Sequence, residues 1–537
     1  MNGPKLVPFP QQIVTYDTQL AIDSKDFKFI TKTKNKCLVL GDAIKRYKDI
    51  TFINDCNRLK SGSYSNKSYN NINYFKYFST LHKLTNITIE MRGHCEDNQW
   101  PDMNMDEMYT IRIDDEDFPE QAFIFANTVW GALRALETFS QLIQHKYDNN
   151  FVVNSTFILD YPRFTYRGLL IDTSRHYLPK HVILENLDIM SYHKMNALHW
   201  HLIDDQSFPY VSLQFPELSA KGAYNPTTHV YTQKDIKEIV EFARVRGIRV
   251  IVEFDSPGHT LSLGKGKPYL LTACYSGDKP NGKLGPLNPS LNTTYDFLNT
   301  LFKEIVGIFP DQYLHLGGNE VDYRCWKSNP DIQTFMKVQR ISGLYYKLEE
   351  YYFKRLFDII TNMNKTWIVW QQVFDKMIDL PNNTIVNVCK EDFNTELYEL
   401  TKLNYKVILS SCWDLNIISY GYDWFQYYHC DPQAFNGSDH QNQLVIGGQA
   451  SMWGEWVDGS NFITTTWPRT MAVAERLWSP KSMNNTTEAQ YRFVRNRCRM
   501  LNRVSKCNPL LNQNNLNLDF VIVIMRFEIN AIHYIKR

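Results

Sequence analysis

The second part of this chain alternates short apolar runs with longer amphipathic segments, and this alternation constrains the fold more than any other feature. Eight runs, each of a length suited to a strand buried on both faces, lie at 169–172, 197–202, 249–254, 312–316, 367–370, 384–388, 406–409 and 444–447. Segments with helical spacing separate them, such as 183–195, 235–246, 295–309 and 343–363. Strands that alternate with helices pair in parallel, so eight units predict a (β/α)8 barrel rather than the alternative, an open doubly wound sheet.

The first 160 or so residues have a different pattern of apolar and polar residues. Alternating runs at 27–30, 84–90 and 109–113 are typical of strands in a half-buried sheet, and 37–47 and 128–144 have helical spacing. We therefore expect an α/β protein with three parts. A small N-terminal α/β domain covers residues 1–162, the catalytic barrel covers 163–511, and a tail of undetermined fold covers 512–537. Two further segments are predicted as a polar loop (61–73) and a tail strand (520–525).

Composition excludes several classes of protein. Lys and Arg total 58 against 57 for Asp and Glu, a formal net charge of +1, and no basic stripe stands out, so a nucleic-acid partner is not expected. No apolar run approaches the 18 or more residues that span a bilayer, so no membrane span is expected. At 43% hydrophobic residues, the chain can form cores, which argues against general disorder.

Polar and aromatic residues crowd the positions just after the apolar runs. In a barrel these positions share one rim, where active sites of this fold lie. The segments are Asp172-Thr173-Ser174-Arg175-His176, His199-Trp200-His201-Leu202-Ile203-Asp204-Asp205, Glu253-Phe254-Asp255-Ser256-Pro257-Gly258-His259, His315-Leu316-Gly317-Gly318-Asn319-Glu320 and Trp453-Gly454-Glu455. The pattern predicts an enzyme.

Glu320 is the sharpest candidate for catalysis. It follows Gly317 and Gly318, which allow the tight turn that would present a side chain to the barrel mouth. A carboxyl group enclosed there by tryptophans would keep its proton, as a general acid must. The alternative is a surface glutamate in a helix-capping turn.

Other rim residues suggest how a ligand is held. Arg175 can bind sugar hydroxyls or carboxylates, or it can form a structural salt bridge with a rim carboxylate. Trp370 and Trp453 offer faces on which a pyranose ring can stack, or else they pack in the core. A rival hypothesis is that His199, His201 and Asp204 bind a metal. We favour a site without metal or cofactor.

Taken together, these rim segments resemble glycoside hydrolase family 20, the β-N-acetylhexosaminidases. The string from His315 to Glu320 is similar to the signature of that family, and the segments that begin at Asp172, His199 and Glu253 are also similar. The resemblance extends from Val7 to Arg499, and within the family the sequence looks most like the lysosomal subunits. It implies a small α/β domain followed by a catalytic barrel that removes terminal β-linked GlcNAc or GalNAc.

The resemblance also implies a mechanism and a set of roles. Glu320 protonates the departing glycosidic oxygen, the 2-acetamido oxygen of the substrate attacks the anomeric carbon, and Glu320 then activates water. The other implied contacts are made by Arg175 to ring hydroxyls, Asp204 and His259 around the acid, Trp370 and Trp453 along the acetamido pocket and sugar face, and Glu455 to an outer hydroxyl.

Three positions depart from the family pattern around the acetamido group. Relatives carry Asp where this chain has Asn319, a Tyr where it has Asp414 (followed by Leu415 and Asn416), and a tryptophan where it has Cys389. A missing charge of this kind costs on the order of 10²–10³ in rate. We expect a weakened hexosaminidase in which Asp414 supplies the charge that Asn319 lacks. The alternative is a catalytically degraded paralogue that acts as a partner subunit or glycan-binding protein.

The resemblance carries further expectations about cysteines, partners and location. It pairs Cys37 with Cys95 and Cys274 with Cys325, and Cys507 is the candidate partner of Cys498, while Cys56, Cys389, Cys412 and Cys430 are interpreted as free thiols. Disulfides and the Asn-x-Ser/Thr triplets suit a glycoprotein that is lysosomal or secreted, although residues 1–4 do not resemble the start of a signal peptide. Partners would be glycoconjugates ending in β-GlcNAc or β-GalNAc, and a second subunit, identical or related. Because Ile417 follows Asn416, no cation favours anionic substrates there, and neutral ones are expected.

Overall fold

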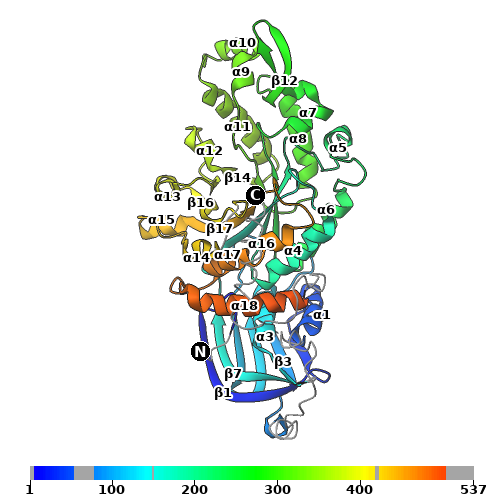
Figure 1. Ribbon diagram of the computed structural model, residues 1–537, viewed down its shortest axis with the longest axis vertical. Coiled ribbons are helices and arrows are strands. Elements are labelled where there is room, and N and C mark those ends of the chain that lie inside the picture. Colours follow the sequence, from blue (N-terminus) through cyan, green and yellow to red (C-terminus); the bar gives the residue numbers. More distant parts are fainter. Residues whose placement is uncertain (1–4, 54–77, 148–149, 418–422, 504–537) are drawn as a thin grey trace, which may run out of the picture.

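A computed structural model describes residues 5–53, 78–147, 150–417 and 423–503. A mixed sheet lies at one end of the molecule and a closed barrel fills the rest (Figure 1). The predicted loop at 61–73, the predicted strand at 520–525 and the tail at 512–537 lie outside the described residues.

The N-terminal part is a seven-stranded sheet in the order β1-β7-β4-β5-β3-β2, with β6 paired to β7. Its strands are β1 (Gln12–Asp23), β2 (Lys28–Lys32), β3 (Asn86–Met91), β4 (Tyr109–Asp115), β5 (Phe118–Ala126), β6 (Gln144–Tyr147) and β7 (Asn150–Asp160). Helices α1 (Leu38–Thr51) and α3 (Val129–Leu142) pack together and contribute apolar residues to the same core as the sheet. Both helices and three of the strands were predicted, whereas β1, β5, β6 and β7 were not.

The second part is a closed barrel of eight parallel strands, as predicted, which excludes the open sheet. Its strands are β8 (Tyr166–Asp172), β9 (Ala197–Ile203), β10 (Arg249–Phe254), β13 (Tyr313–His315), β14 (Thr366–Trp370), β15 (Ile385–Val388), β16 (Lys406–Leu409) and β17 (Val445–Met452). Every residue of β8, β9 and β10 is buried. Such strands are covered on both faces, which is why they read as continuous apolar runs in the sequence.

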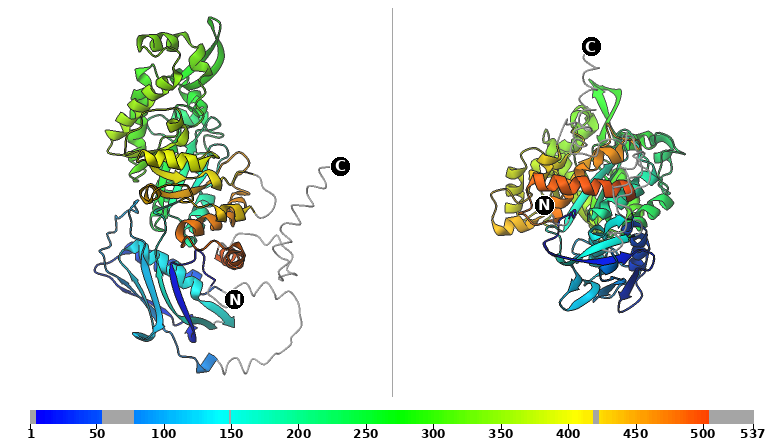
Figure 2. Two further views of the ribbon diagram at one scale, coloured as in Figure 1. Left: turned by 90° about the vertical axis from the view of Figure 1, so that its left-hand side faces the viewer. Right: turned by 60° about the horizontal axis from the view of Figure 1, so that its bottom comes forward.

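Helices surround the barrel (Figures 1 and 2). The longer ones are α4 (Lys180–Tyr192), α6 (Gln233–Arg244), α8 (Asn292–Val306), α10 (Pro330–Val338), α11 (Tyr345–Thr361), α13 (Phe393–Lys402), α17 (Arg469–Trp478) and α18 (Thr486–Arg503). The shorter ones are α5 (Glu217–Gly222), α7 (Leu261–Gly266), α9 (Arg324–Ser328), α12 (Gln371–Asp375), α14 (Trp424–His429), α15 (Asp439–Leu444) and α16 (Phe462–Thr466). Strands β11 (Leu271–Ser276) and β12 (Lys279–Leu287) form a hairpin outside the barrel.

Buried charges join the two parts. Glu107, from the N-terminal part, accepts hydrogen bonds from Arg134 and from Arg167 of β8, and all three side chains are buried. Asp160 pairs in the same way with Lys194 at 2.8 Å. Removing one partner from a buried ion pair costs about 3–5 kcal/mol, so these pairs fix the sheet against the barrel. No helix in the described ranges is long and apolar enough to span a bilayer.

The cysteines agree with only part of the expectation. Disulfides join Cys37 to Cys95 and Cys274 to Cys325, as the resemblance implied. Cys498 is also disulfide-bonded, and its candidate partner Cys507 lies outside the described residues, as does Cys56. The interpretation of Cys412 and Cys430 as free thiols is wrong, because they form a disulfide. They lie 18 positions apart in the sequence, in the segment that connects β16 to β17. Cys389 is free.

Candidate active site

The rim at the carboxyl ends of the barrel strands brings the sequence-predicted residues together. Asp172, at the end of β8, accepts backbone N–H bonds from Ser174 and Arg175 and one from Gly454 after β17. Its other contact is with the Arg175 guanidinium at 3.1 Å. Asp172 thereby joins two neighbouring strand ends and orients Arg175.

Arg175 also pairs with Asp204 at 2.9 Å, and its guanidinium lies over the Trp453 ring, 5.0 Å from the centroid. The salt-bridge interpretation of Arg175 is thus correct, while its side chain keeps 13% exposure toward the mouth. Burial alone would lower the pKa of Arg175, but the charges of Asp172 and Asp204 hold it above its ordinary value. This cation is fixed in place for a ligand.

Asp204 is the centre of a chain of charged groups that leads to Glu320. One carboxylate oxygen accepts from His201 Nε2 at 2.8 Å and the other from His259 Nδ1 at 3.0 Å. On the far side of the His259 ring, Nε2 lies 4.0 Å from a carboxylate oxygen of Glu320. Burial opposes ionisation of Asp204, but the hydrogen bonds from His201 and His259 hold its pKa below the ordinary value.

His259 is held as a cation by its neighbours. Burial by itself lowers its pKa, but the charge of Asp255 and the hydrogen bond with Asp204 raise the pKa of His259 to about 9. Asp255 is a buried carboxyl group, and burial raises its pKa to about 7. The Nε2 atom of this imidazolium lies 4.0 Å from a carboxylate oxygen of Glu320.

Beneath this rim, a buried polar network occupies the barrel interior. Glu253 accepts hydrogen bonds from His201 Nδ1 at 2.6 Å, His199 Nε2 at 3.0 Å and the Trp370 indole N–H at 2.6 Å, and His315 Nδ1 lies 3.0 Å away. Burial opposes the charge of Glu253, but the histidines hold its pKa well below the ordinary value. The network positions the ring of Trp370 and the imidazole of His201.

The glycines before Glu320 are used as predicted. Gly317 and Gly318 have φ of +74° and +92°, and the Gly318 N–H donates to Asp255 at 2.7 Å. A Cβ on Gly317 would collide with Asp255, so the turn requires glycine in both conformation and space. Glu320 itself has φ of +45°, and its N–H donates to Gln372. The expectation that tryptophans enclose this carboxyl group is wrong, because the Glu320 side chain is 69% exposed.

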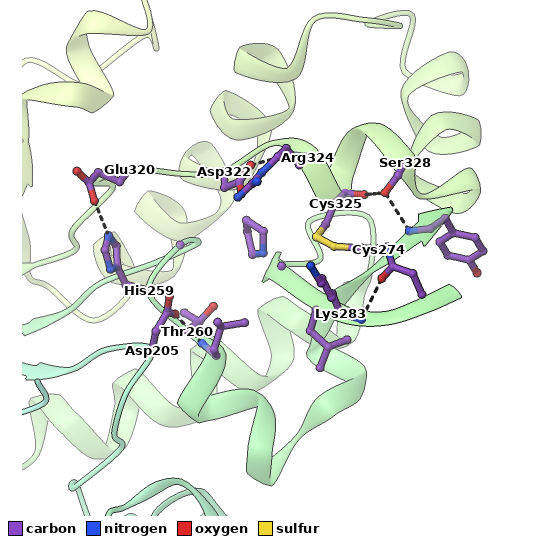
Figure 3. Close-up of a pocket in the computed structure, with 17 residues that line it drawn as sticks. Asp205, His259, Thr260, Cys274, Lys283, Glu320, Asp322, Arg324, Cys325 and Ser328 are labelled. Carbon is purple, nitrogen blue, oxygen red and sulfur yellow. Dashed lines mark hydrogen bonds and ion pairs between the residues drawn. A yellow bond between two sulfur atoms is a disulfide. The ribbon is translucent and has the colours of Figure 1, made fainter. Parts of the chain in front are cut away.

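A cavity of about 530 Å³ opens beside Glu320 and His259. Its lining includes Asp205 and Thr260 near the barrel, and Cys274, Lys283 and Cys325 on its far side (Figure 3). Arg175, Trp370, Trp453, Asp414, Asn416 and Glu455 do not line it. Of the predicted catalytic and substrate-binding residues, all of which the structure describes, Glu320 and His259 line this cavity.

Asn319, Asp414 and Cys389 are at the neighbouring strand ends. The Asn319 side-chain oxygen is buried and has no hydrogen-bond partner. Asp414 accepts the Asn416 N–H, and burial raises the pKa of the Asp414 carboxyl group. The Asn416 amide nitrogen donates to Glu455 at 3.1 Å. Burial raises the pKa of the Cys389 thiol to about 12, and the charges of Glu253 and Glu320 contribute to this shift.

The two tryptophans differ in exposure. Trp370 is only 1% exposed and packs against His199 and His315, so it is part of the interior as well as of the site floor. Trp453 is half-buried and lies between Arg175 and His201. Of the two rings, that of Trp453 is the more exposed.

The three residues proposed from the sequence as metal ligands, His199, His201 and Asp204, are not a group that the fold places around one point. Both ring nitrogens of His201 bond to carboxylates, while His199, Glu253 and His315 lie close enough to share an ion. His199 and His315 each contact the Glu253 carboxylate at 3.0 Å. A second group, Asp204, Asp205 and His259, also lies close enough to share an ion.

Asp172, Glu253 and Asp255 were noted at strand ends in the sequence without a role, and His201 was considered only as a metal ligand. The signal was present, since all four lie at inward positions of β8, β9 and β10 or just after them. The sequence pattern does not predict which of these side chains contact one another, because contacting residues such as Glu253 and Trp370 lie 117 positions apart.

Comparison with known proteins agrees with this geometry. Residues 164–481 match the family described as "Glycosyl hydrolase family 20, catalytic domain", and residues 6–142 match "beta-acetyl hexosaminidase like". The chain is 47% identical to "Beta-hexosaminidase subunit alpha" of Bos taurus over 513 residues, which cover 94% of each chain. It is 45% identical to "Beta-hexosaminidase subunit beta" of Homo sapiens over 514 residues, covering 95% of this chain and 89% of that one.

Solved structures share the fold. The chitobiase of Flavobacterium johnsoniae superposes with a TM-score of 0.78 at 26% identity, covering 94% of this chain and 74% of that one. The N-acetyl-beta-hexosaminidase of Streptomyces plicatus superposes with a TM-score of 0.68 at 20% identity, covering 94% and 97%. The second likeness supports the fold alone.

Proposed function

The chain belongs to glycosyl hydrolase family 20 and is a glycoside hydrolase of the β-N-acetylhexosaminidase type, and from this membership we propose the roles of its rim residues. Glu320 is the acid/base that protonates the glycosidic oxygen and later takes a proton from water. The observation that supports this role most is the chain Asp204–His259–Glu320, whose last two members lie 4.0 Å apart. It gives the exposed carboxyl group a fixed cationic neighbour.

The substrate supplies its own nucleophile in this proposal. Its 2-acetamido oxygen bonds to the anomeric carbon as the bond to the leaving group breaks, and the proton on Glu320 passes to that leaving oxygen. Water, deprotonated by Glu320, then opens the oxazolinium ring and restores the acetamido group with retained configuration. Asn319 faces the acetamido N–H, and its unpartnered buried oxygen supports this role, because a buried acceptor without a partner is costly unless a ligand satisfies it.

The terminal sugar lies against Trp453, with Arg175 on its ring hydroxyls and Glu455, steadied by Asn416, on an outer hydroxyl. Trp370 closes the acetamido pocket from below, oriented by Glu253. Asp414 offsets part of the positive charge of the oxazolinium. Because burial raises the pKa of Asp414, this compensation grows with pH and is weak in acid.

The enzyme acts on glycoconjugates that end in β-GlcNAc or β-GalNAc. Relatives named as alpha and beta subunits support assembly with a second copy or a related subunit. Disulfides such as Cys37–Cys95 support passage through an oxidising compartment on the way to a lysosomal or secreted location. The comparisons do not favour the degraded-paralogue alternative, and we retain weakened catalysis, which follows from the missing charge at Asn319.

The decisive experiment is turnover of 4-nitrophenyl N-acetyl-β-glucosaminide by the native protein and by Glu320→Gln. We expect Glu320→Gln to abolish turnover, while the control Glu238→Gln, a change on α6 away from the rim, leaves it unaltered. A native protein without activity, unaffected by Glu320→Gln, would refute the assignment. Binding of a thiazoline analogue of the oxazolinium should also weaken in Asn319→Leu if the acetamido pocket is where we place it.

A further inference from the structure

Four consecutive strands of the barrel carry the residues around the acetamido group of the proposed substrate. In the closed sheet their order is β13, β14, β15 and β16. Asn319 comes after β13, Trp370 ends β14, and Asp414 comes after β16. Cys389 directly follows β15, so it occupies the strand end between those of Trp370 and Asp414.

The side chain of Cys389 faces the inside of the barrel. Ile385, four positions earlier, belongs to one apolar cluster with residues of β8, β9 and β10, strands that do not neighbour β15 in the sheet. Side chains from such strands meet only in the barrel interior. Because alternate residues of a strand face the same side, Asn387 and Cys389 face the interior as well. Burial raises the pKa of the Cys389 thiol to about 12, and the charges of Glu253 and Glu320 add to this shift, which agrees with that direction.

A cysteine leaves this part of the wall open. Cys389 is only half-buried, whereas Trp370 on the neighbouring strand is 1% exposed. An inward residue at a barrel mouth keeps such exposure when no other side chain covers it. The family resemblance implies a tryptophan at this position, so the chain carries a small thiol next to the acyl group where a large ring is expected.

A buried donor lies just below this position. The side-chain nitrogen of Asn387 has no hydrogen-bond partner among the residues that the structure describes, and Asn387 is 1% exposed. Its side-chain oxygen already accepts a hydrogen bond from Ser410. Asn387 is one inward step below Cys389 on the same strand. A buried donor without a partner is costly, so a ligand that brings an acceptor to it gains affinity.

An N-acetyl group does not supply that acceptor. In the proposed function its N–H pairs with Asn319 and its oxygen bonds to the anomeric carbon, and the methyl group neither donates nor accepts. An N-glycolyl group carries one more hydroxyl, on the carbon that is the methyl of an acetyl group, and this hydroxyl accepts hydrogen bonds. It keeps the attacking oxygen, so the same bonds form and break, and the intermediate is an oxazolinium with a hydroxymethyl substituent.

We propose that the opening at Cys389 lets the enzyme bind and cleave substrates whose 2-acylamino group is N-glycolyl, with the extra hydroxyl accepting from the Asn387 amide. Cys389 sets the length of the acyl group, and Asn387 reads its polar end. The inference rests on the proposed function, because it requires the acyl oxygen of the substrate to be the nucleophile.

The test uses three 4-nitrophenyl β-glucosaminides that differ only in their N-acyl group, which is acetyl, propanoyl or glycolyl. The propanoyl group has the length of the glycolyl group without its hydroxyl, so the pair separates space from hydrogen bonding. Cys389→Trp closes the opening, and Asn387→Leu removes the donor at nearly constant shape. The control Val338→Trp adds the same ring on α10, at a side chain that is 72% exposed.

We expect the native kcat/KM for the glycolyl substrate to equal or exceed that for the acetyl substrate and to exceed that for the propanoyl substrate about five- to tenfold, the effect of one hydrogen bond. Cys389→Trp should lower both longer substrates about tenfold or more relative to the acetyl substrate, because a closed pocket rejects the added length. Asn387→Leu should remove the difference between the glycolyl and propanoyl substrates, and Val338→Trp should alter no ratio.

Three results overturn the proposal: a native preference for acetyl over glycolyl of more than about tenfold, equal native values for glycolyl and propanoyl, or unaltered ratios in Cys389→Trp. Because Cys389→Trp can disturb folding, a second measurement uses the native protein alone. A thiazoline inhibitor with a hydroxymethyl substituent should bind at least as tightly as its methyl counterpart, and clearly weaker binding overturns the proposal too. Failure of the proposed function looks different, since the native protein would then hydrolyse none of the three substrates and would be indifferent to Glu320→Gln.

Discussion

The replacement Asn319→Asp should convert this enzyme into a faster one. The Asn319 side-chain oxygen is buried without a partner, and the residue directly precedes the exposed acid Glu320. A carboxylate at this position would accept the same acetamido N–H and would add a negative charge where the oxazolinium develops its positive one. The backbone does not change, since Asn and Asp have almost the same shape.

Two estimates of the gain agree. Opposite unit charges about 4 Å apart interact by about 4 kcal/mol at an effective dielectric constant of about 20. Mutational loss of one preorganised electrostatic contact costs about 3–4 kcal/mol, on the order of 10²–10³ in kcat. In our proposal Asp414 supplies part of this charge already, although burial raises its pKa. We therefore expect about a hundredfold rise in kcat at pH values where the introduced carboxyl group is ionised, and a smaller rise in acid, where it is protonated.

The assay is kcat for 4-nitrophenyl N-acetyl-β-glucosaminide across the pH range, at saturating substrate, for the native protein, Asn319→Asp, Asp414→Tyr and the double variant. The exposed change Asn362→Asp controls for a general effect of added charge. A kcat for Asn319→Asp that is equal to or below the native value at every pH would refute the reasoning.

Three further predictions concern the groups around the site. Folding raises the pKa of His259 from 6.5 to about 9, so its protonation stabilises the native protein below about pH 6.5, and this stabilisation is lost as the pH rises to about 9. His259→Gln should therefore lower the free energy of unfolding by up to about 3 kcal/mol at pH 6. Urea denaturation should show that the difference in unfolding free energy between the two proteins is smaller at pH 9 than at pH 6. Trp370→Phe should destabilise the fold by about 2–3 kcal/mol by removing the N–H bond to charged Glu253, and an unchanged denaturation midpoint would contradict that network. Replacing Cys412 and Cys430 together by Ser should cost about 3 kcal/mol, the value for a loop of this length, and calorimetry should show no such loss if the bond does not form.

The barrel could be predicted because its information is local. Runs such as 249–254 are mostly apolar and buried along their whole length, because they lie between an inner core and a layer of helices. The N-terminal sheet was harder to predict from the sequence. In β1, most side chains from Gln12 to Gln19 are exposed, so it shows no buried face to recognise and pairs with β7 only through long-range contact.

The candidate site was predictable in composition and position but not in contacts. Glu320 could be singled out because two glycines precede it at a strand end, and the turn does use their positive φ. Its surroundings could not be predicted, since enclosure by tryptophans depends on where the loops after other strands go, and they leave this carboxyl group exposed.

The sequence alone predicted the number of barrel strands, the rim that carries the candidate site and the candidate acid Glu320, because strand burial and strand ends leave a pattern of neighbouring residues. The tertiary structure decided which charges meet. The pairing of Asp204 with His259, the hydrogen bond from Trp370 to Glu253 and the Cys412–Cys430 disulfide all join different segments of the chain. The partners of the first two contacts come within a few ångströms only when the parallel strands close into a barrel, and no local pattern records that closure.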